Sequence, residues 1–301
     1  MITHLNDPDS DKVIIFVHGL GGAESTWKKF TDYMNGNWKS GISFDVKYFL
    51  FYRSFISKQL LKTPVIKWII GFIIWLLSKI YWFIKLLWSK RNTHNANILE
   101  DYINKNCNEH KNIIIVAHSM GGLIARQYLI NVRKKNLDFK RFKILVTYAT
   151  PHKGSHVASV FNINNIIFFR TFYKYLADYF NYRLCPQLGD LSPTSEFINK
   201  LETDWTSYGI ESKLLFLRVA GKKDLLVRRE SAILHENNIE NIYEYDYSHG
   251  GLINPNVDNK FEPIDLFIEK LNKTSFDVEE YYSELDDEII YEDNEDDDES
   301  Y

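Results

Sequence analysis

The chain has 301 residues, of which 45% are hydrophobic and 25% are charged, with 14 Gly and 7 Pro. This composition excludes a collagen-like chain and a wholly disordered one. The length suits one large α/β domain or two small domains. Only two cysteines occur, Cys107 and Cys185, so we expect neither a disulfide framework nor a zinc site. Residues 1–10 are polar and acidic, unlike a secretory signal, and we expect a reducing, cytosolic environment.

The net charge of −4 conceals an asymmetry along the chain. Residues 277–301 carry 14 Asp and Glu and no Lys or Arg, which leaves 36 basic and 26 acidic residues elsewhere. A run of like charge this dense repels itself, so we expect an acidic, disordered tail at 277–301. The tail either only adds solubility, or it folds back on the basic body and competes with an anionic partner.

Short apolar runs alternate with helical segments along most of the chain. Buried strands are predicted at 12–17, 44–52, 112–117, 142–149, 213–220 and 241–245. Helices are predicted at 25–34, 97–106, 121–132 and 263–271, the first with Ser25 or Thr26 as its N-cap. Apolar strands separated by helices indicate a mostly parallel sheet that is covered on both faces. The aromatic-rich stretch 156–208 shows no strong strand and is predicted to be a helical cap over one end of the sheet.

The stretch IIIVAHSMGGLIAR, from Ile113 to Arg126, places a serine between a predicted strand and a predicted helix. A turn this sharp accepts only small residues two positions before and after the serine, where Ala117 and Gly121 stand. It strains the backbone and lifts the hydroxyl of Ser119 above the sheet edge. The backbone amide of Met120, at the helix N-terminus, would point to the place where an oxyanion forms. The motif therefore predicts a nucleophilic serine.

Other segments supply the partners that such a serine needs. The run VHGLGG at 17–22 follows an early strand, and we assign the second oxyanion donor to the backbone amide of Leu20. Asp224 and His249 each follow a predicted strand, so we expect them at the same sheet edge as Ser119. In this arrangement Ser119 attacks a carbonyl, His249 transfers the proton, and Asp224 orients His249.

Several neighbouring residues compete for these roles. Glu230 and Asp246 are alternatives to Asp224 as the acid. His118 adjoins the serine, but the alternation of side chains along a strand predicts that its ring points away from the site. We therefore interpret His118 and His18 as structural. Ordinary surface or cap positions are expected for His152, His156 and His235.

Together the motifs resemble serine lipases and esterases of the α/β-hydrolase superfamily, and within it the GPI inositol-deacylase-like and serine-active-site-containing lipase-like group. The resemblance rests on VHGLGG, VAHSMGGLIARQYL, ATPHKGS, VAGKKDLLV and SHGGL, which stand in the expected order over about residues 12–271. Ala117 departs from the more usual glycine but is still small. The resemblance implies the α/β-hydrolase fold, an acyl-enzyme on Ser119 and a structural loop at Thr150–His152. It implies no metal and no organic cofactor.

Residues 65–88, VIKWIIGFIIWLLSKIYWFIKLLW, are apolar almost throughout and hold four of the seven tryptophans. Residues 46–99 contain nine Lys or Arg and no Asp or Glu, a pattern that suits an anionic lipid surface. A single membrane crossing would leave two strands of one sheet on opposite sides of the bilayer. We therefore expect a monotopic or re-entrant element in the interface. The alternative is a lid that packs on the protein itself.

The sequence thus predicts one α/β-hydrolase domain over 1–276, with a hydrophobic basic insert at 54–95 and the cap at 156–208. The expected reaction is hydrolysis of a carboxylic ester, and the expected substrate is a lipid ester at a membrane on which residues 64–88 dock. An acyltransferase, a soluble esterase or thioesterase, and a non-catalytic membrane-associated scaffold are the alternatives. We expect a cytoplasmic protein that is peripheral or monotopic at the membrane and has no nucleic-acid partner.

Overall fold

The structure is a computed structural model that describes residues 5–20, 22–50, 91–155, 190–234, 241–255 and 260–276. The predictions made for the docking segment 64–88, for residues 156–189 of the cap and for the tail 277–301 lie outside these residues. The same is true of His156 and His235.

A six-stranded sheet in the order β2-β1-β3-β4-β5-β6 forms the centre of the described fold. The strands are β1 (Lys12–Val17), β2 (Asp45–Phe49), β3 (Asn112–His118), β4 (Phe142–Tyr148), β5 (Leu215–Gly221) and β6 (Ile242–Tyr245). Every neighbouring pair is parallel, which confirms the predicted α/β class. Because β1 lies between β2 and β3, the order of the chain reverses there. The carboxyl ends of β1 and β3 therefore flank the crevice in which such sheets bind ligands.

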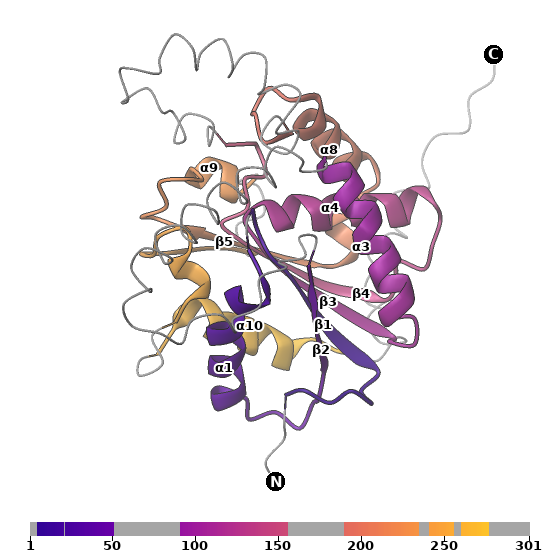
Figure 1. Cartoon of the computed structure of the whole chain (residues 1–301), viewed down its shortest axis with the longest axis vertical. Coiled ribbons are helices and arrows are strands. Elements are labelled where there is room, and N and C mark those ends of the chain that lie inside the picture. Colours follow the sequence, from indigo (N-terminus) through magenta and orange to yellow (C-terminus); the bar gives the residue numbers. More distant parts are fainter. Residues whose placement is uncertain are drawn as a thin grey trace, which may run out of the picture.

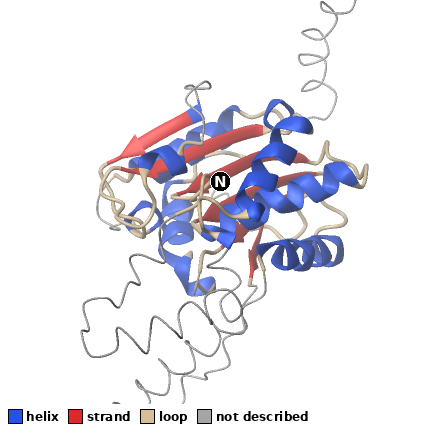
Figure 2. Cartoon of the chain, turned by 90° about the horizontal axis from the view of Figure 1, so that it is seen from above, coloured by secondary structure: helices blue, strands red, loops and turns tan. Residues whose placement is uncertain are grey.

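Helices cover both faces of the sheet, as predicted. On one face lie α3 (Asn92–Asn106), α4 (Met120–Lys134) and α8 (Glu196–Ser207), and on the other lie α1 (Lys28–Asn37) and α10 (Glu262–Lys273) (Figure 1). Figure 2 shows the same layers from above. The shorter elements are η1 (Glu24–Thr26), η3 (Glu211–Lys213), α9 (Arg229–Ala232) and η5 (Gly251–Ile253).

The two layers follow from alternation along continuously apolar strands. In β1, Val13 and Ile15 belong to the core under α3 and α4, whereas Ile14 and Phe16 belong to the core under α1 and α10. β3 is buried at all seven of its positions. A strand apolar on both faces is stable only between two helical layers, which explains why these runs form the central strands.

Two helices begin at other residues than predicted. Neither Ser25 nor Thr26 is the N-cap of α1, because both lie in η1 and α1 starts at Lys28 without a side-chain cap. α3 starts at Asn92 rather than at 97, and its first backbone N–H donates to the carboxylate of Asp190 at 2.9 Å. Asp190 is remote in sequence, so local patterns do not reveal this cap.

α8 falls within the stretch assigned to the cap, yet it is part of the helical layer over the sheet. Its apolar side chains Ile198, Leu201 and Trp205 recur at helical spacing and are buried in the core shared with α4. The fully buried guanidinium of Arg126 in α4 donates to Glu202 at 2.9 Å and lies 4.6 Å from the ring of Trp205. The described end of the expected cap is thus core structure.

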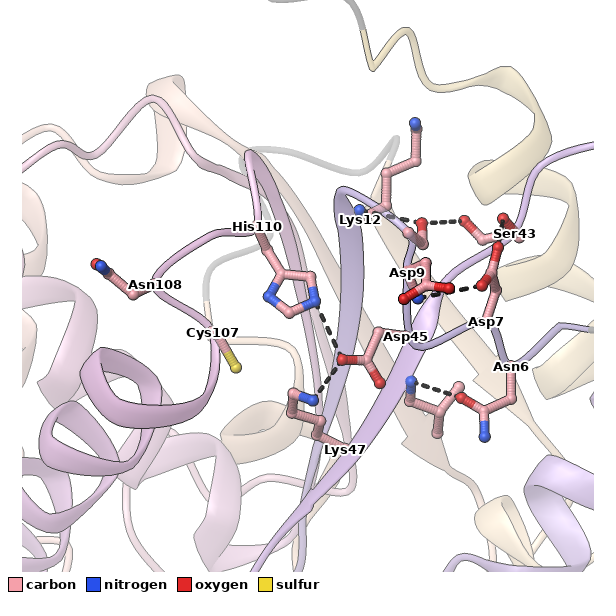
Figure 3. Close-up of polar contacts among 12 residues, drawn as sticks. Asn6, Asp7, Asp9, Lys12, Ser43, Asp45, Lys47, Cys107, Asn108 and His110 are labelled. Carbon is pink, nitrogen blue, oxygen red and sulfur yellow. Dashed lines mark hydrogen bonds and ion pairs between the residues drawn. The ribbon is translucent and has the colours of Figure 1, made fainter.

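Polar contacts hold the amino ends of the first strands together, at the sheet edge away from the serine (Figure 3). Asp45 of β2 accepts from His110 at 3.1 Å and pairs with Lys47. The neighbouring Cys107 is buried and forms no disulfide, and burial raises the pKa of its thiol to about 11. A thiol this poorly ionised is inert at neutral pH, so this cluster is a structural brace.

The packing of α8 predicts a large stability loss in Leu201→Ala. The side chain is fully buried, so its truncation leaves a cavity that costs about 2–5 kcal/mol. The matched control Leu137→Ala removes a leucine that is 44% exposed and changes stability by less than about 0.5 kcal/mol. Urea unfolding followed by circular dichroism measures both. Equal losses in the two variants would contradict a core role for α8.

Candidate active site

Ser119 stands in the predicted sharp turn between β3 and α4. It is the N-cap of α4, with φ 55° and ψ −130°, a backbone conformation that costs a non-glycine residue about 1–3 kcal/mol. Its N–H donates to the carbonyl of Tyr148 in β4 at 2.8 Å. The buried strand and helix on either side hold the residue in this strained geometry.

Two glycines at the start of α4 allow neighbouring loops to approach the turn closely. A Cβ on Gly121 would lie 2.6 Å from the carbonyl oxygens of both Val17 and His18. A Cβ on Gly122 would lie 2.1 Å from the hydroxyl of Thr150. The loop after β1, the start of α4 and the loop after β4 therefore meet at distances that no side chain permits.

The structure brings Ser119, Asp224 and His249 together. His249 Nδ1 lies 2.8 Å from Asp224 Oδ2, and His249 Nε2 lies 2.9 Å from Ser119 Oγ. A carboxylate only accepts, so Nδ1 carries the proton and Nε2 accepts from the serine hydroxyl. The second carboxylate oxygen of Asp224 accepts from the backbone N–H groups of Leu226 and Val227 at 2.8 and 2.9 Å. The acid is thereby fixed, with its side chain only 1% exposed.

The alternative acids lie elsewhere. Glu230 is exposed in α9, and Asp246 is exposed and pairs with Lys223 at 2.6 Å. Neither is the carboxylate bonded to His249, which is Asp224.

The two expected oxyanion donors, Met120 and Leu20, belong to segments that adjoin the serine. Met120 is the first residue of α4, so its N–H is one of the first-turn donors that a helix leaves without an intrahelical acceptor. Gly19 packs so closely that a Cβ there would lie 2.8 Å from the Cβ of Ser119. The backbone of Leu20 follows directly. Gly19 in the loop after β1 and Met120 at the start of α4 thus both lie beside the serine.

Two buried histidines lie close to this group. Burial lowers the pKa of His18 to about 4, although the bond between its Nδ1 and the Gly19 carbonyl works in the opposite direction. Burial, and then the nearby His249, lower the pKa of His118 to about 3. Both rings are therefore neutral at pH 7.

The prediction that His118 points away from the site is wrong. Its Nε2 lies 3.0 Å from the backbone carbonyl of His249, and the centroids of the two rings are 4.8 Å apart. The backbone reverses direction at Ser119 and ends the regular strand. The alternation of side chains, which holds for regular strands, therefore does not predict the direction of the His118 ring. Adjacency to the strained serine was the one available sequence signal.

The prediction of an ordinary surface or cap position for His152 is also wrong, because its side chain is buried. Its Nδ1 accepts from Arg126 at 3.3 Å, and its Nε2 lies 3.1 Å from the hydroxyl of Thr147. The ring thus ties the loop 150–155, to which His152 belongs, to α4 and β4, which agrees with a structural role for that loop.

Within the described ranges, no group of three or more His, Cys, Asp or Glu is arranged to hold a metal ion. Among the same residues, no helix combines the length and the apolar character that crossing a membrane requires.

The parallel sheet and the strand–serine–helix turn define the α/β-hydrolase fold. The mature lipase BlEst2 from Bacillus licheniformis aligns with a TM-score of 0.52 at 16% identity, over 87% of this chain and 94% of that one. Its propeptide form aligns with a TM-score of 0.53 at 16% identity, over 88% of this chain and 52% of that one. No curated protein matches in sequence.

Residues 89–236, just under half of the chain, match the family described as the PGAP1-like alpha/beta domain, so this part of the chain is similar to that family. The match confirms the family resemblance inferred from the motifs. It includes Ser119 and Asp224, whereas Leu20 and His249 lie outside the matched residues.

The glycine packing predicts opposite effects for two Gly→Ala variants. Gly121→Ala forces the backbone at Val17 and His18 to shift and costs about 1–3 kcal/mol. Gly36→Ala, in α1 with nothing within 4 Å of the added Cβ, raises stability by about 0.5–1 kcal/mol because the helix loses a flexible residue. Thermal and urea unfolding measure the pair. A Gly121→Ala protein as stable as wild type would contradict the close approach of the loop after β1.

Proposed function

We propose that the protein is a serine esterase that cleaves carboxylic esters through an acyl-enzyme on Ser119. The observation that carries the proposal is the hydrogen-bonded series from Asp224 through His249 to Ser119, with distances of 2.8 and 2.9 Å. A nucleophile bonded to a base, and a base bonded to an orienting acid, form the arrangement that activates a hydroxyl.

In the proposed mechanism Ser119 Oγ attacks the ester carbon while its proton passes to His249 Nε2. The tetrahedral oxyanion accepts from the backbone N–H groups of Leu20 and Met120. His249 then gives the proton to the departing alkoxide, the carbon–oxygen bond breaks, and an acyl-serine remains. In the second half-reaction His249 takes a proton from a water molecule, which attacks the acyl-serine. His249 then returns the proton to Ser119 Oγ, and the carboxylic acid product leaves. Asp224 fixes the tautomer of His249 and stabilises the imidazolium that forms in each half-reaction.

The oxyanion donors carry a large share of this mechanism. Removing one such donor from a serine hydrolase costs about 10²–10³ in kcat, or about 3–4 kcal/mol. Both donors here are backbone groups at the carboxyl edge of the sheet, one in the loop after β1 and one at the start of α4. Backbone groups on rigid elements need no reorganisation as the charge develops.

The proposed substrate is a lipid ester, and the proposed location is the cytoplasmic face of a membrane. The support is the sequence of residues 64–88 within the insert 54–95, because an apolar, tryptophan-rich segment with basic flanks partitions to anionic interfaces. The insert follows β2, whose carboxyl end lies at the same sheet edge as Ser119. Docking there would present the site to lipid.

Labelling with a fluorophosphonate probe tests the mechanism. Intact mass should show one adduct on the wild type and none on Ser119→Ala. Asp224→Asn should lower the labelling rate and kcat by about 10⁴-fold, because the base then takes the wrong tautomer. The control Asp246→Asn changes an exposed aspartate that pairs with Lys223 and does not contact His249, so it should label as fast as the wild type. An unlabelled wild type, even with vesicles present, would refute the hydrolase mechanism and favour the non-catalytic scaffold.

Flotation with vesicles tests the lipid proposal. Vesicles with about a third phosphatidylserine should bind the wild type about 30-fold more tightly than Lys67→Gln/Lys85→Gln, since each lysine near an anionic surface contributes about 1 kcal/mol. The control Lys200→Gln/Lys273→Gln removes two exposed lysines outside the insert and should bind like the wild type. Equal binding by both double variants would favour a lid packed on the protein.

A further inference from the structure

The hydrogen bond between His118 and the backbone of His249 joins two parts of the candidate site. His118 is the last residue of β3 and directly precedes Ser119. Its Nε2 lies 3.0 Å from the carbonyl oxygen of His249, which is 131 residues away in sequence. The neighbour of the nucleophile is therefore bound to the main chain of the base.

The loop that carries His249 has few other restraints. Ser248 and Gly250 are exposed, and Gly250 and Gly251 follow the histidine. A Cβ added to Gly250 would meet nothing within 4 Å. Within the described part of the chain, the hydrogen bond from His118 alone ties the backbone of residues 248–251 to another segment. Asp224 restrains the ring of His249, but it does not hold this main chain.

The chemistry of the bond fixes the state of His118. A carbonyl oxygen only accepts, so Nε2 of His118 must carry its proton and Nδ1 must not in the neutral ring. Burial keeps the ring neutral, with a pKa of about 3. Trp27 contacts the ring edge-on, at a centroid distance of 6.4 Å, and limits its rotation. His118 is thus a donor of fixed orientation at every pH where His249 can act as a base.

We propose that His118 is a positioning residue, which holds the His249 loop so that the imidazole stays in line with Ser119. This role rests on the proposed esterase function. His118 touches no reacting atom. Its effect is on geometry, and a misplacement of about 1 Å in such a site costs about 10²-fold in rate. His118 ends β3, and Ser119 follows it directly. Any movement of β3 therefore shifts the nucleophile and the base together.

Two variants separate positioning from packing. His118→Phe keeps a ring of similar size against Trp27 but removes the donor, and it should lower kcat on a short p-nitrophenyl ester about 10²-fold with little change in KM. His118→Gln retains an Nε2–H donor at a similar distance from the backbone and should restore most of the lost kcat. His94→Gln, which replaces an exposed histidine of α3, is the control and should match the wild type. The fluorophosphonate labelling rate should follow kcat in all three.

A spectroscopic measurement tests the bond without using activity. In ¹⁵N-histidine spectra the His118 signal, assigned by its loss in His118→Gln, should show the Nε2–H tautomer and should stay unchanged from pH 8 to pH 5. If His118→Phe does not fold, this measurement on the wild type decides the matter. An Nδ1–H tautomer, a wild-type kcat in His118→Phe, or a His118→Gln as impaired as His118→Phe would each overturn the proposal. A wild type unreactive at Ser119 would instead refute the esterase function.

Discussion

The strained backbone at Ser119 is the constraint on which the site depends. With φ 55° the chain reverses within one residue, from a strand buried at every position to a helix that is also largely buried. The burial of both elements in two apolar cores provides the free energy that keeps the residue in this conformation. The same reversal needs space, and this explains why Gly19, Gly121 and Gly122 surround it.

The sheet order turns this local constraint into a site. Ser119 follows β3, Asp224 follows β5 and His249 follows β6, so residues far apart in the sequence meet at one carboxyl edge. Between β3 and β5 lies β4, whose Tyr148 carbonyl accepts from the N–H of Ser119. The acid and the nucleophile are thus held by backbone hydrogen bonds, whereas the base sits on an exposed loop.

The sequence predicts the central strands well, and it also predicts that Ser119, Asp224 and His249 come together. Both predictions follow from local patterns. Continuous apolar runs mark the strands, and polar residues just after them lie at one edge of a parallel sheet. What it misses depends on tertiary contacts. The start of α3 is set by Asp190, the position of His152 in the loop after β4 by Arg126 of α4, and the place of α8 by packing on α4. The direction of the His118 ring depends on a backbone reversal that a regular strand pattern does not contain.

The electrostatics of the site follow from burial rather than from many charges. When His249 takes up a proton, the positive charge arises 2.8 Å from the carboxylate of Asp224. A second cation beside it would cancel part of that stabilisation. The nearest histidine, His118, stays uncharged because its desolvation costs more than its hydrogen bond returns, and the same balance holds for His18. A polar, uncharged neighbour can therefore orient the base without competing for the acid, which a lysine or an arginine at position 118 could not do.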